Sequence, residues 1–338
     1  MSPQLTTRFV IDPIRLCNLK CKFCYHLHSH STWKDYTWPL DKAKAWIDAG
    51  VARGNNYMDI TGGEPTIYPY IEEIVAYAKS KGVLSCIITN GIVTRSKAES
   101  ILNAGLDGWL ISRHGLKDTH NNVTNFSQAY DRQLEFLEFI KGKAQIRFNC
   151  VIHKFNELEL DKIADELRPY CPEIVNFINM NPHTDWISQS LATKDVIANL
   201  NTVEPLLNAS IAILEKSGIG VNVRYYPMCR IAEEYRRCIC NDLQVLFDPY
   251  EWDYQIEPKT FQAYEAWGKN TSNCNEEKGD PCNHCDLQNI CGGANKHWHK
   301  ASKDIHGEVL KPQQLLTQGI KDFYYYRQHN TRTLKPRV

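Results

Sequence analysis

The chain has no run of roughly 20 consecutive apolar residues, which a membrane-spanning helix requires, and its first eight residues contain no signal-peptide hydrophobic region. It also has no excess of charge, because Lys plus Arg and Asp plus Glu both number 39. Net charge therefore gives no argument for nucleic acid or a membrane as partner. These absences predict a cytoplasmic location without membrane contact.

Cysteine, by contrast, is abundant, with 13 residues among 338. Three lie at positions 17, 21 and 24, and seven fall between positions 229 and 291. In a reducing compartment, clustered cysteines indicate metal binding rather than disulfides. The sequence therefore predicts two metal-binding regions.

The first two-thirds of the chain alternates short β-branched or apolar runs with longer amphipathic ones, which predicts an α/β fold with a mainly parallel sheet. We predict strands at Arg8–Ile11, Tyr57–Ile60, Leu84–Thr89, Gly108–Ser112, Gln145–Ile152, Ile174–Asn179 and Gly220–Tyr225. We predict helices at Leu40–Arg53, Tyr70–Lys81, Arg95–Ala104, Phe126–Lys141, Glu157–Leu167 and Thr193–Lys216. Ligands of such sheets bind beyond the carboxyl ends of the strands.

The first cysteine group follows the first predicted strand. Cys17, Cys21 and Cys24 have x3 and x2 spacing, which suits three corners of an iron–sulfur cubane and leaves one iron open to an outside ligand. Zinc is the alternative, with a fourth ligand from His26, His28 or His30.

This loop resembles the cluster-binding motif of the radical SAM superfamily, CxxxCxxC with an aromatic residue, here Phe23, before the last cysteine. The segment with Gly62, Gly63 and Glu64 matches the GGE motif of that family. The resemblance covers roughly residues 8–225 and implies a partial (β/α)6 TIM-like barrel. It also implies a [4Fe-4S] cluster, and S-adenosylmethionine (SAM) whose amino group meets the GGE segment.

Further segments match the family at the ends of later strands. By resemblance, Asn90 lines the cofactor, Ser112 meets the ribose and Arg113 meets the methionine carboxylate. A guanidinium is well suited to a carboxylate. Val151 and Ile152 end the fifth predicted strand, where the family often contacts adenine, and Asn156 lies just beyond.

The second cysteine group, Cys282, Cys285 and Cys291, has x2 and x5 spacing and resembles part of the SPASM auxiliary-cluster module. It departs from that module, because Asn295 stands where a further cysteine is expected. We therefore predict a cysteine-rich extension with one auxiliary iron–sulfur cluster. Its fourth ligand would come from Cys240 or Cys274. A structural zinc is the alternative, and Cys229 is a candidate hydrogen-atom donor.

The predicted organisation is a barrel at 1–225, an auxiliary-cluster region at 226–300 and a basic, aromatic helix or tail at 301–338. The resemblance implies an enzyme of the oxidoreductase or isomerase class. It would take an electron from a flavodoxin- or ferredoxin-type donor, cleave SAM to a 5′-deoxyadenosyl radical and abstract hydrogen from a substrate. A SPASM-like region favours a peptide or protein side chain over nucleic acid. The alternatives are a nucleoside, sugar or nucleic-acid base as substrate, and a non-catalytic zinc-binding interaction module.

Overall fold

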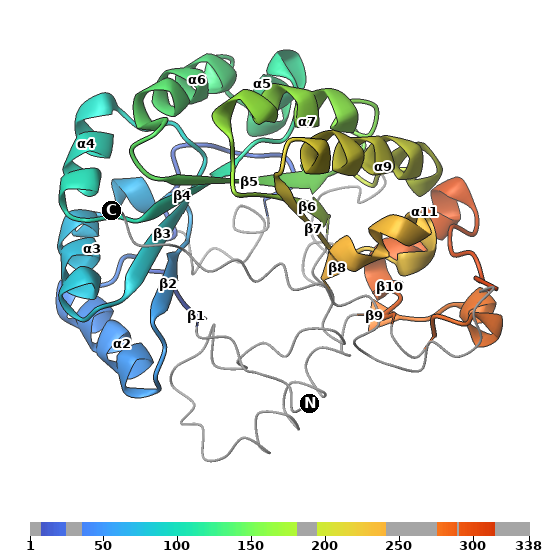
Figure 1. Ribbon diagram of the computed structural model, residues 1–338, viewed down its shortest axis with the longest axis horizontal. Helices are drawn as coiled ribbons and strands as arrows, with labels where there is room; N and C mark the ends of the chain where they lie inside the picture. Colours follow the sequence, from blue (N-terminus) through green and yellow to red (C-terminus); the bar gives the residue numbers. More distant parts are fainter. Residues whose placement is uncertain (1–7, 25–35, 181–194, 241–275, 289–290, 315–338) are drawn as a thin grey trace.

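A computed structural model describes residues 8–24, 36–180, 195–240, 276–288 and 291–314. Its centre is a parallel sheet whose strands follow one another in chain order. The sheet curls into a half-barrel with helices on its outer side (Figure 1), which confirms the predicted partial barrel. The strands are β1 (Arg8–Ile11), β2 (Tyr57–Ile60), β3 (Leu84–Thr89), β4 (Gly108–Ser112), β5 (Gln145–Ile152), β6 (Ile174–Asn179), β7 (Gly220–Arg224) and the short β8 (Ile239–Cys240).

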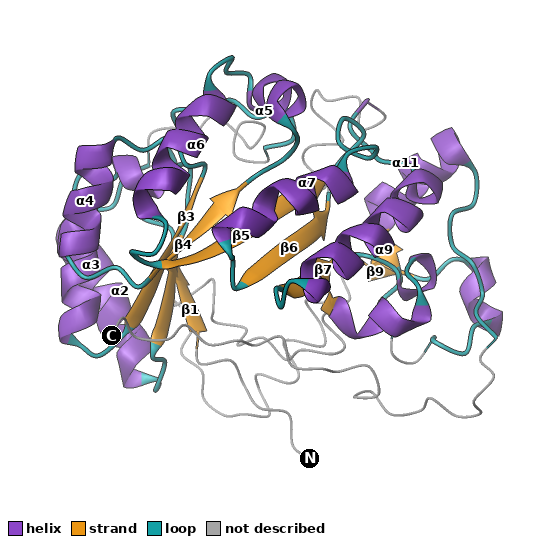
Figure 2. Ribbon diagram, turned by 45° about the horizontal axis from the view of Figure 1, so that its top comes forward, coloured by secondary structure: helices purple, strands orange, loops and turns teal. Residues whose placement is uncertain are grey.

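The helices between these strands cover the outer face of the sheet, as Figure 2 shows. They are α2 (Leu40–Ala52), α3 (Ile71–Ser80), α4 (Arg95–Asn103), α5 (Lys117–Thr124), α6 (Ala129–Ile140), α7 (Leu160–Leu167) and α9 (Leu200–Lys216). Helix α5 was not predicted, because its buried side consists of His120, Val123 and Thr124 and so has no apolar period.

The two faces of the sheet differ in chemistry. The helix-facing side chains, such as Ile87, Trp109 and Phe148, belong to the main hydrophobic core. The inner face has a small separate cluster built on Cys86 and Leu110. Towards the carboxyl ends of β5 to β7 the inward-pointing side chains are half-buried, namely Asn149, Val151, Asn176, Ile178, Asn222 and Arg224. The inner face is therefore the accessible one.

Charged and polar groups close the amino-terminal end of this inner face. Arg8 pairs with Asp59 at 2.9 Å, and the Tyr57 hydroxyl donates to the same carboxylate. Arg147, on β5, in turn donates to the Tyr57 oxygen at 3.1 Å. These contacts fill the inner face at the amino-terminal end of the strands, and ligands of such sheets generally bind at the opposite, carboxyl end.

The C-terminal part contains a two-stranded antiparallel sheet of β9 (Glu276–Glu277) and β10 (Ala294–Asn295), followed by helix α11 (Lys296–His306). Helix α11 crosses the predicted boundary at residue 300. The parallel sheet continues past the predicted limit at residue 225, because β8 pairs with β7. Among the helices that the structure describes, none has the length and apolarity to span a bilayer.

Candidate active site and a second thiol cavity

The GGE segment after β2 is joined to the chain that leads into the first cysteine loop. The amide of Gly63 donates to the carbonyl of Ile14, and that of Glu64 to the carbonyl of Leu16, both at 2.8 Å. A Cβ on Gly63 would lie 2.1 Å from the Leu16 oxygen, and one on Gly62 would lie 2.2 Å from the Ile14 oxygen. The two glycines are thus needed for this backbone contact, which places the cysteine loop.

Glu64 is fully buried and accepts four hydrogen bonds. Its Oε1 accepts from the backbone and hydroxyl of Thr66 and from the hydroxyl of Thr89, and its Oε2 accepts from the backbone of Asn90 at 2.8 Å. Burial raises the pKa of Glu64, and these four donors oppose the rise. The carboxylate therefore links the ends of β2 and β3.

The thiols of Cys17, Cys21 and Cys24 lie close enough to influence one another electrostatically. Burial, followed by a smaller contribution from the neighbouring thiols, raises the pKa of Cys21, and burial raises that of Cys17 to about 11. The Leu19 amide donates to the Cys17 sulfur at 3.4 Å, and the Asn90 side chain approaches it at 3.8 Å. A positive metal centre would stabilise the thiolates that burial disfavours.

Phe23 packs between two buried histidines. Its ring centroid lies 4.7 Å from that of His114, edge to face, and 5.0 Å from that of His153. Burial lowers the pKa of His114 to about 3 and that of His153 well below its usual range. Burial thus favours the neutral form of both imidazoles, and their rings pack against the aromatic residue of the cysteine loop.

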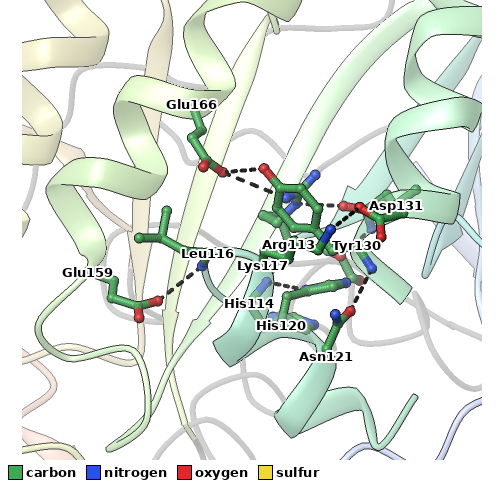
Figure 3. A network of polar contacts seen from close by, with 12 residues as sticks. Arg113, His114, Leu116, Lys117, His120, Asn121, Tyr130, Asp131, Glu159 and Glu166 are labelled. Atoms are coloured by element: carbon green, nitrogen blue, oxygen red, sulfur yellow. Dashed lines mark hydrogen bonds and ion pairs between the residues drawn. The ribbon is translucent and has the colours of Figure 1, made fainter. Parts of the chain in front are cut away.

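Arg113 and Ser112 lie on opposite faces of β4. Ser112 is half-buried on the inner face, whereas Arg113 is 2% exposed and points into the helix layer. Figure 3 shows its guanidinium beside Tyr130, where it lies 4.2 Å from the ring centroid and 3.8 Å from Glu166. In this arrangement Arg113 supports helices α6 and α7, and its contacts give no support for the expected carboxylate-binding role.

A row of amide side chains crosses the inner face of the half-barrel. Asn149, Asn176 and Asn222 are paired in register on β5, β6 and β7. Asn222 donates to Asn176 at 3.0 Å, and Asn176 donates to Asn149 at 2.8 Å. The Oδ1 of Asn222 is buried without a hydrogen-bond partner among the described residues. The row therefore ends on a buried acceptor without a partner among the described residues.

The residues at the end of β5 also divide between the two faces. Ile152 is fully buried in the helix-facing core, whereas Val151 is half-buried on the inner side. In this arrangement the buried side chain of Ile152 therefore cannot make the predicted adenine contact. Of the two residues, Val151 is the one that faces the inside of the half-barrel.

The sequence prediction missed Gln133, a fully buried residue of α6. Its Nε2 donates to the carbonyl oxygens of Asn90 and Ser112 at 2.7 and 2.8 Å, and its Oε1 accepts from Arg113 at 2.6 Å. It thus fixes the ends of β3 and β4. A glutamine on the apolar side of an amphipathic helix was the available signal, because buried amides need partners.

The predicted auxiliary ligands Cys282, Cys285 and Cys291 line one cavity in the C-terminal part, and Cys229 lines it with them. Cys274 lies outside the described residues, as does the side chain of Cys240, whose backbone ends β8. Within the described ranges, no three His, Cys, Asp or Glu side chains are gathered around a single-ion site.

The half-barrel and its three-thiol loop define a class of cofactor-binding α/β proteins, and comparison with known proteins identifies the family. Residues 11–167 match the model of the Radical SAM superfamily. This chain therefore carries a radical SAM domain. The match ends before the cysteine-rich region, so the SPASM-like character of that region stays a prediction.

Two curated relatives match part of the chain. An Fe-coproporphyrin III synthase of Methanosarcina barkeri (strain Fusaro / DSM 804) is 31% identical over 155 residues, which cover 45% of this chain and 39% of that protein. A probable GTP 3′,8-cyclase of Saccharolobus solfataricus is 30% identical over 172 residues, which cover 49% of this chain and 54% of that protein. The matched segment thus spans about half or less of each relative.

Two solved structures share the fold. Native anSMEcpe with bound AdoMet and Kp18Cys peptide has a TM-score of 0.57 at 16% identity, and the match covers 88% of this chain and 96% of that one. Streptococcus suis SuiB bound to precursor peptide SuiA has a TM-score of 0.52 at 18% identity, with 65% of this chain and 49% of that one covered. At these identities the likeness concerns the fold alone.

Proposed function

We propose that this chain is a radical SAM enzyme whose [4Fe-4S] cluster is held by Cys17, Cys21 and Cys24. The observation that carries the proposal is the convergence of three thiols in one loop, beside Asn90, at the carboxyl end of the half-barrel. With three protein thiolates, such a cluster keeps one iron free for SAM. When bound, the two cofactors supply a 5′-deoxyadenosyl radical, after one-electron reduction by a flavodoxin- or ferredoxin-type donor.

The residues of the chain position and shield this chemistry. The carboxylate of Glu64 holds the Asn90 loop against the first cysteine, and Phe23 with its two histidines keeps water from the base of the cluster loop. On the inner face, Ser112 and Val151 are the half-buried residues placed to meet the nucleoside. Exclusion of water and fixed placement both suppress side reactions of a radical.

For the substrate we favour a peptide or protein side chain. The row of Asn149, Asn176 and Asn222 offers alternating amide donors and acceptors on the accessible face of the sheet. These groups are complementary to a peptide backbone. Two proteins of the same fold carry peptides in their structures. The rival substrate class is a nucleotide, because a probable GTP 3′,8-cyclase is among the relatives.

Deuterium transfer distinguishes these two classes. The anaerobic protein, with dithionite and SAM, is given either a uniformly deuterated mixture of small peptides or a deuterated mixture of ribonucleotides. We expect mass spectrometry to find deuterated 5′-deoxyadenosine with the peptides and not with the nucleotides. Deuterium from the nucleotides alone would overturn the peptide assignment.

The cleavage itself is tested with Cys21→Ala, compared with Cys86→Ala as control. Cys86 is a fully buried thiol of β3 that belongs to the small inner cluster. We expect Cys21→Ala to make no 5′-deoxyadenosine and Cys86→Ala to remain active. Formation of 5′-deoxyadenosine by Cys21→Ala would contradict the proposed function. A cytoplasmic location accompanies this proposal, because a reducing compartment keeps cysteines as thiols.

A further inference from the structure

Four thiols from three separate segments meet in the C-terminal cavity. Cys229 lies in the short helix η5 (Met228–Arg230) that follows β7, Cys282 lies in η7 (Asp280–His284), and Cys285 follows directly. Cys291 precedes β10. Cys229 is 53 to 62 residues distant in sequence from the other three, yet it lines the same space. Only folding brings this set together.

Backbone amides point at three of the four sulfurs. The amide of Lys311 donates to Cys229 at 3.4 Å, that of Gln313 donates to Cys285 at 3.3 Å, and that of Gly293 donates to Cys291 at 3.4 Å. A thiol is a weak acceptor, whereas hydrogen bonds to a charged group are about twice as strong as neutral ones. Amides aimed at sulfur are also among the features that set cluster potentials.

Two cationic residues, Lys278 and Lys311, also line the cavity. Lys311 pairs with Glu204 at 3.5 Å. The charge of Lys278 would offset part of the negative charge of a thiolate-bound cluster. A metal centre would itself bring the positive charge that makes four thiolates stable together.

We propose that Cys229, Cys282, Cys285 and Cys291 together hold one auxiliary iron–sulfur cluster, with Cys229 as the fourth ligand instead of Cys240 or Cys274. This ligand set deepens the proposed function and rests on it only for its role in a radical enzyme. Cys229 is then a metal ligand rather than a hydrogen-atom donor.

The geometry favours a cluster over zinc. A zinc ion draws four sulfurs to about 2.3 Å from one point, whereas a cubane distributes its thiolates over separate irons. The four thiols surround a cavity, which suits a cluster whose irons occupy several positions. With four protein thiolates, every iron of a cubane has its ligand. Such a centre has no open iron for SAM or substrate, in contrast to the first cluster.

The test measures iron and sulfide in a variant that cannot bind the first cluster. In the full chain carrying Cys17→Ala, Cys21→Ala and Cys24→Ala, anaerobic reconstitution should leave about four iron and four sulfide per chain. Adding Cys229→Ala should remove them. The matched control is Cys238→Ala, because Cys238 is also buried but donates to Glu215 at 3.7 Å and does not line the cavity. It should keep the full content.

Three results would overturn the proposal: full iron content in the Cys229→Ala protein, loss of iron on Cys274→Ala or Cys240→Ala, or one zinc per chain in place of iron. Cys229→Ser distinguishes loss of a ligand from misfolding, because serine has nearly the size of cysteine and offers an oxygen ligand. We expect it to retain iron with an altered paramagnetic resonance spectrum of the reduced cluster. An unchanged spectrum would remove Cys229 from the ligand set. None of these measurements depends on SAM cleavage, so the proposed function can fail independently.

Discussion

Asn90 is held by Glu64 and in turn approaches the first cysteine of the cluster loop. Its backbone amide donates to Glu64 Oε2 at 2.8 Å, while its side chain donates to Asn18 at 2.7 Å and lies 3.8 Å from the Cys17 sulfur. The motif after β2 therefore acts on the cysteine loop through the end of β3. Its acidic residue orders the site in addition to any contact with the methionine amino group.

Glu64→Gln tests this relationship. The amide can keep an oxygen towards Thr66 and Thr89, but its NH2 group would then face the Asn90 amide, donor against donor. We expect a loss of about 1–3 kcal/mol in the free energy of unfolding, measured in urea, together with weaker SAM binding by equilibrium dialysis. Thr66→Val, which removes one donor and leaves the acceptor intact, should cost less. Equal values for Glu64→Gln and the wild type would show that the carboxylate does not order the loop.

Gly63→Ala tests the contact between the GGE segment and the cysteine loop. The added Cβ would lie 2.1 Å from the Leu16 oxygen, so the chain before Cys17 must move. We expect the reconstituted protein to lose the first cluster, as measured by iron and sulfide content and by visible absorbance. Gly142→Ala is the control. Its added Cβ has no neighbouring atom within 4 Å, so only the positive φ of residue 142 disfavours alanine there. Normal iron content in Gly63→Ala would mean that the loop accommodates the methyl group.

The sequence predicted the sheet well because its strands are strongly patterned. All seven predicted strands are present, and β7 ends one residue earlier than expected, at Arg224. The motifs around Cys17 and Gly63 were found because thiols and paired glycines are rare enough to stand out. What the sequence could not give was side-chain direction. Arg113 and Ile152 end adjacent strands but face the helix layer, since alternation along a strand depends on register.

The long-range partners were missed for a related reason. Nothing in the local sequence around Cys229 distinguishes it from Cys238, yet only Cys229 lines the cavity with Cys282, Cys285 and Cys291. The position of a loop after β7 relative to a segment 53 to 62 residues later is a tertiary property, and spacing rules do not contain it. The amide row on β5 to β7 was missed likewise, because its three members are neighbours only across strands.

Buried histidines predict an acid-sensitive fold. Burial lowers the pKa of His114 to about 3 and that of His120 well below its usual value of about 6.5. The unfolded chain binds protons at these sites as the pH falls below about 6.5, and the folded chain does not. Stability is therefore fully present above about pH 6.5 and falls towards about pH 3, by about 1.4 kcal/mol per pH unit for each histidine.

His120→Asn should remove the contribution of one proton from the pH dependence of the free energy of unfolding. This is measured by urea unfolding between about pH 5 and 7. Asparagine can replace Nδ1 of His120 as acceptor for the His114 amide. Because the variant and the wild type carry the same clusters, acid loss of iron affects them alike. A slope for His120→Asn equal to that of the wild type would mean that His120 does not enter the proton balance.

Substitutions of Arg113 distinguish a role in supporting the helices from direct contact with the cofactor. Arg113→Gln removes a cation that is 2% exposed, lies 4.2 Å from the Tyr130 ring centroid and hydrogen-bonds to Gln133 at 2.6 Å. We expect it to cost about 2–4 kcal/mol in the free energy of unfolding. Its partner Glu166 is 39% exposed, so Glu166→Gln should cost less than about 1 kcal/mol.

Arg113→Lys then decides the role. Lysine keeps the charge but cannot reproduce the planar fork. If the guanidinium binds the methionine carboxylate, SAM affinity should fall while stability changes little. If it supports α6 and α7, as its contacts indicate, stability should fall and SAM affinity of the folded protein should change less than twofold, by equilibrium dialysis below the unfolding transition. A tenfold loss of affinity at unchanged stability would restore the carboxylate-binding role.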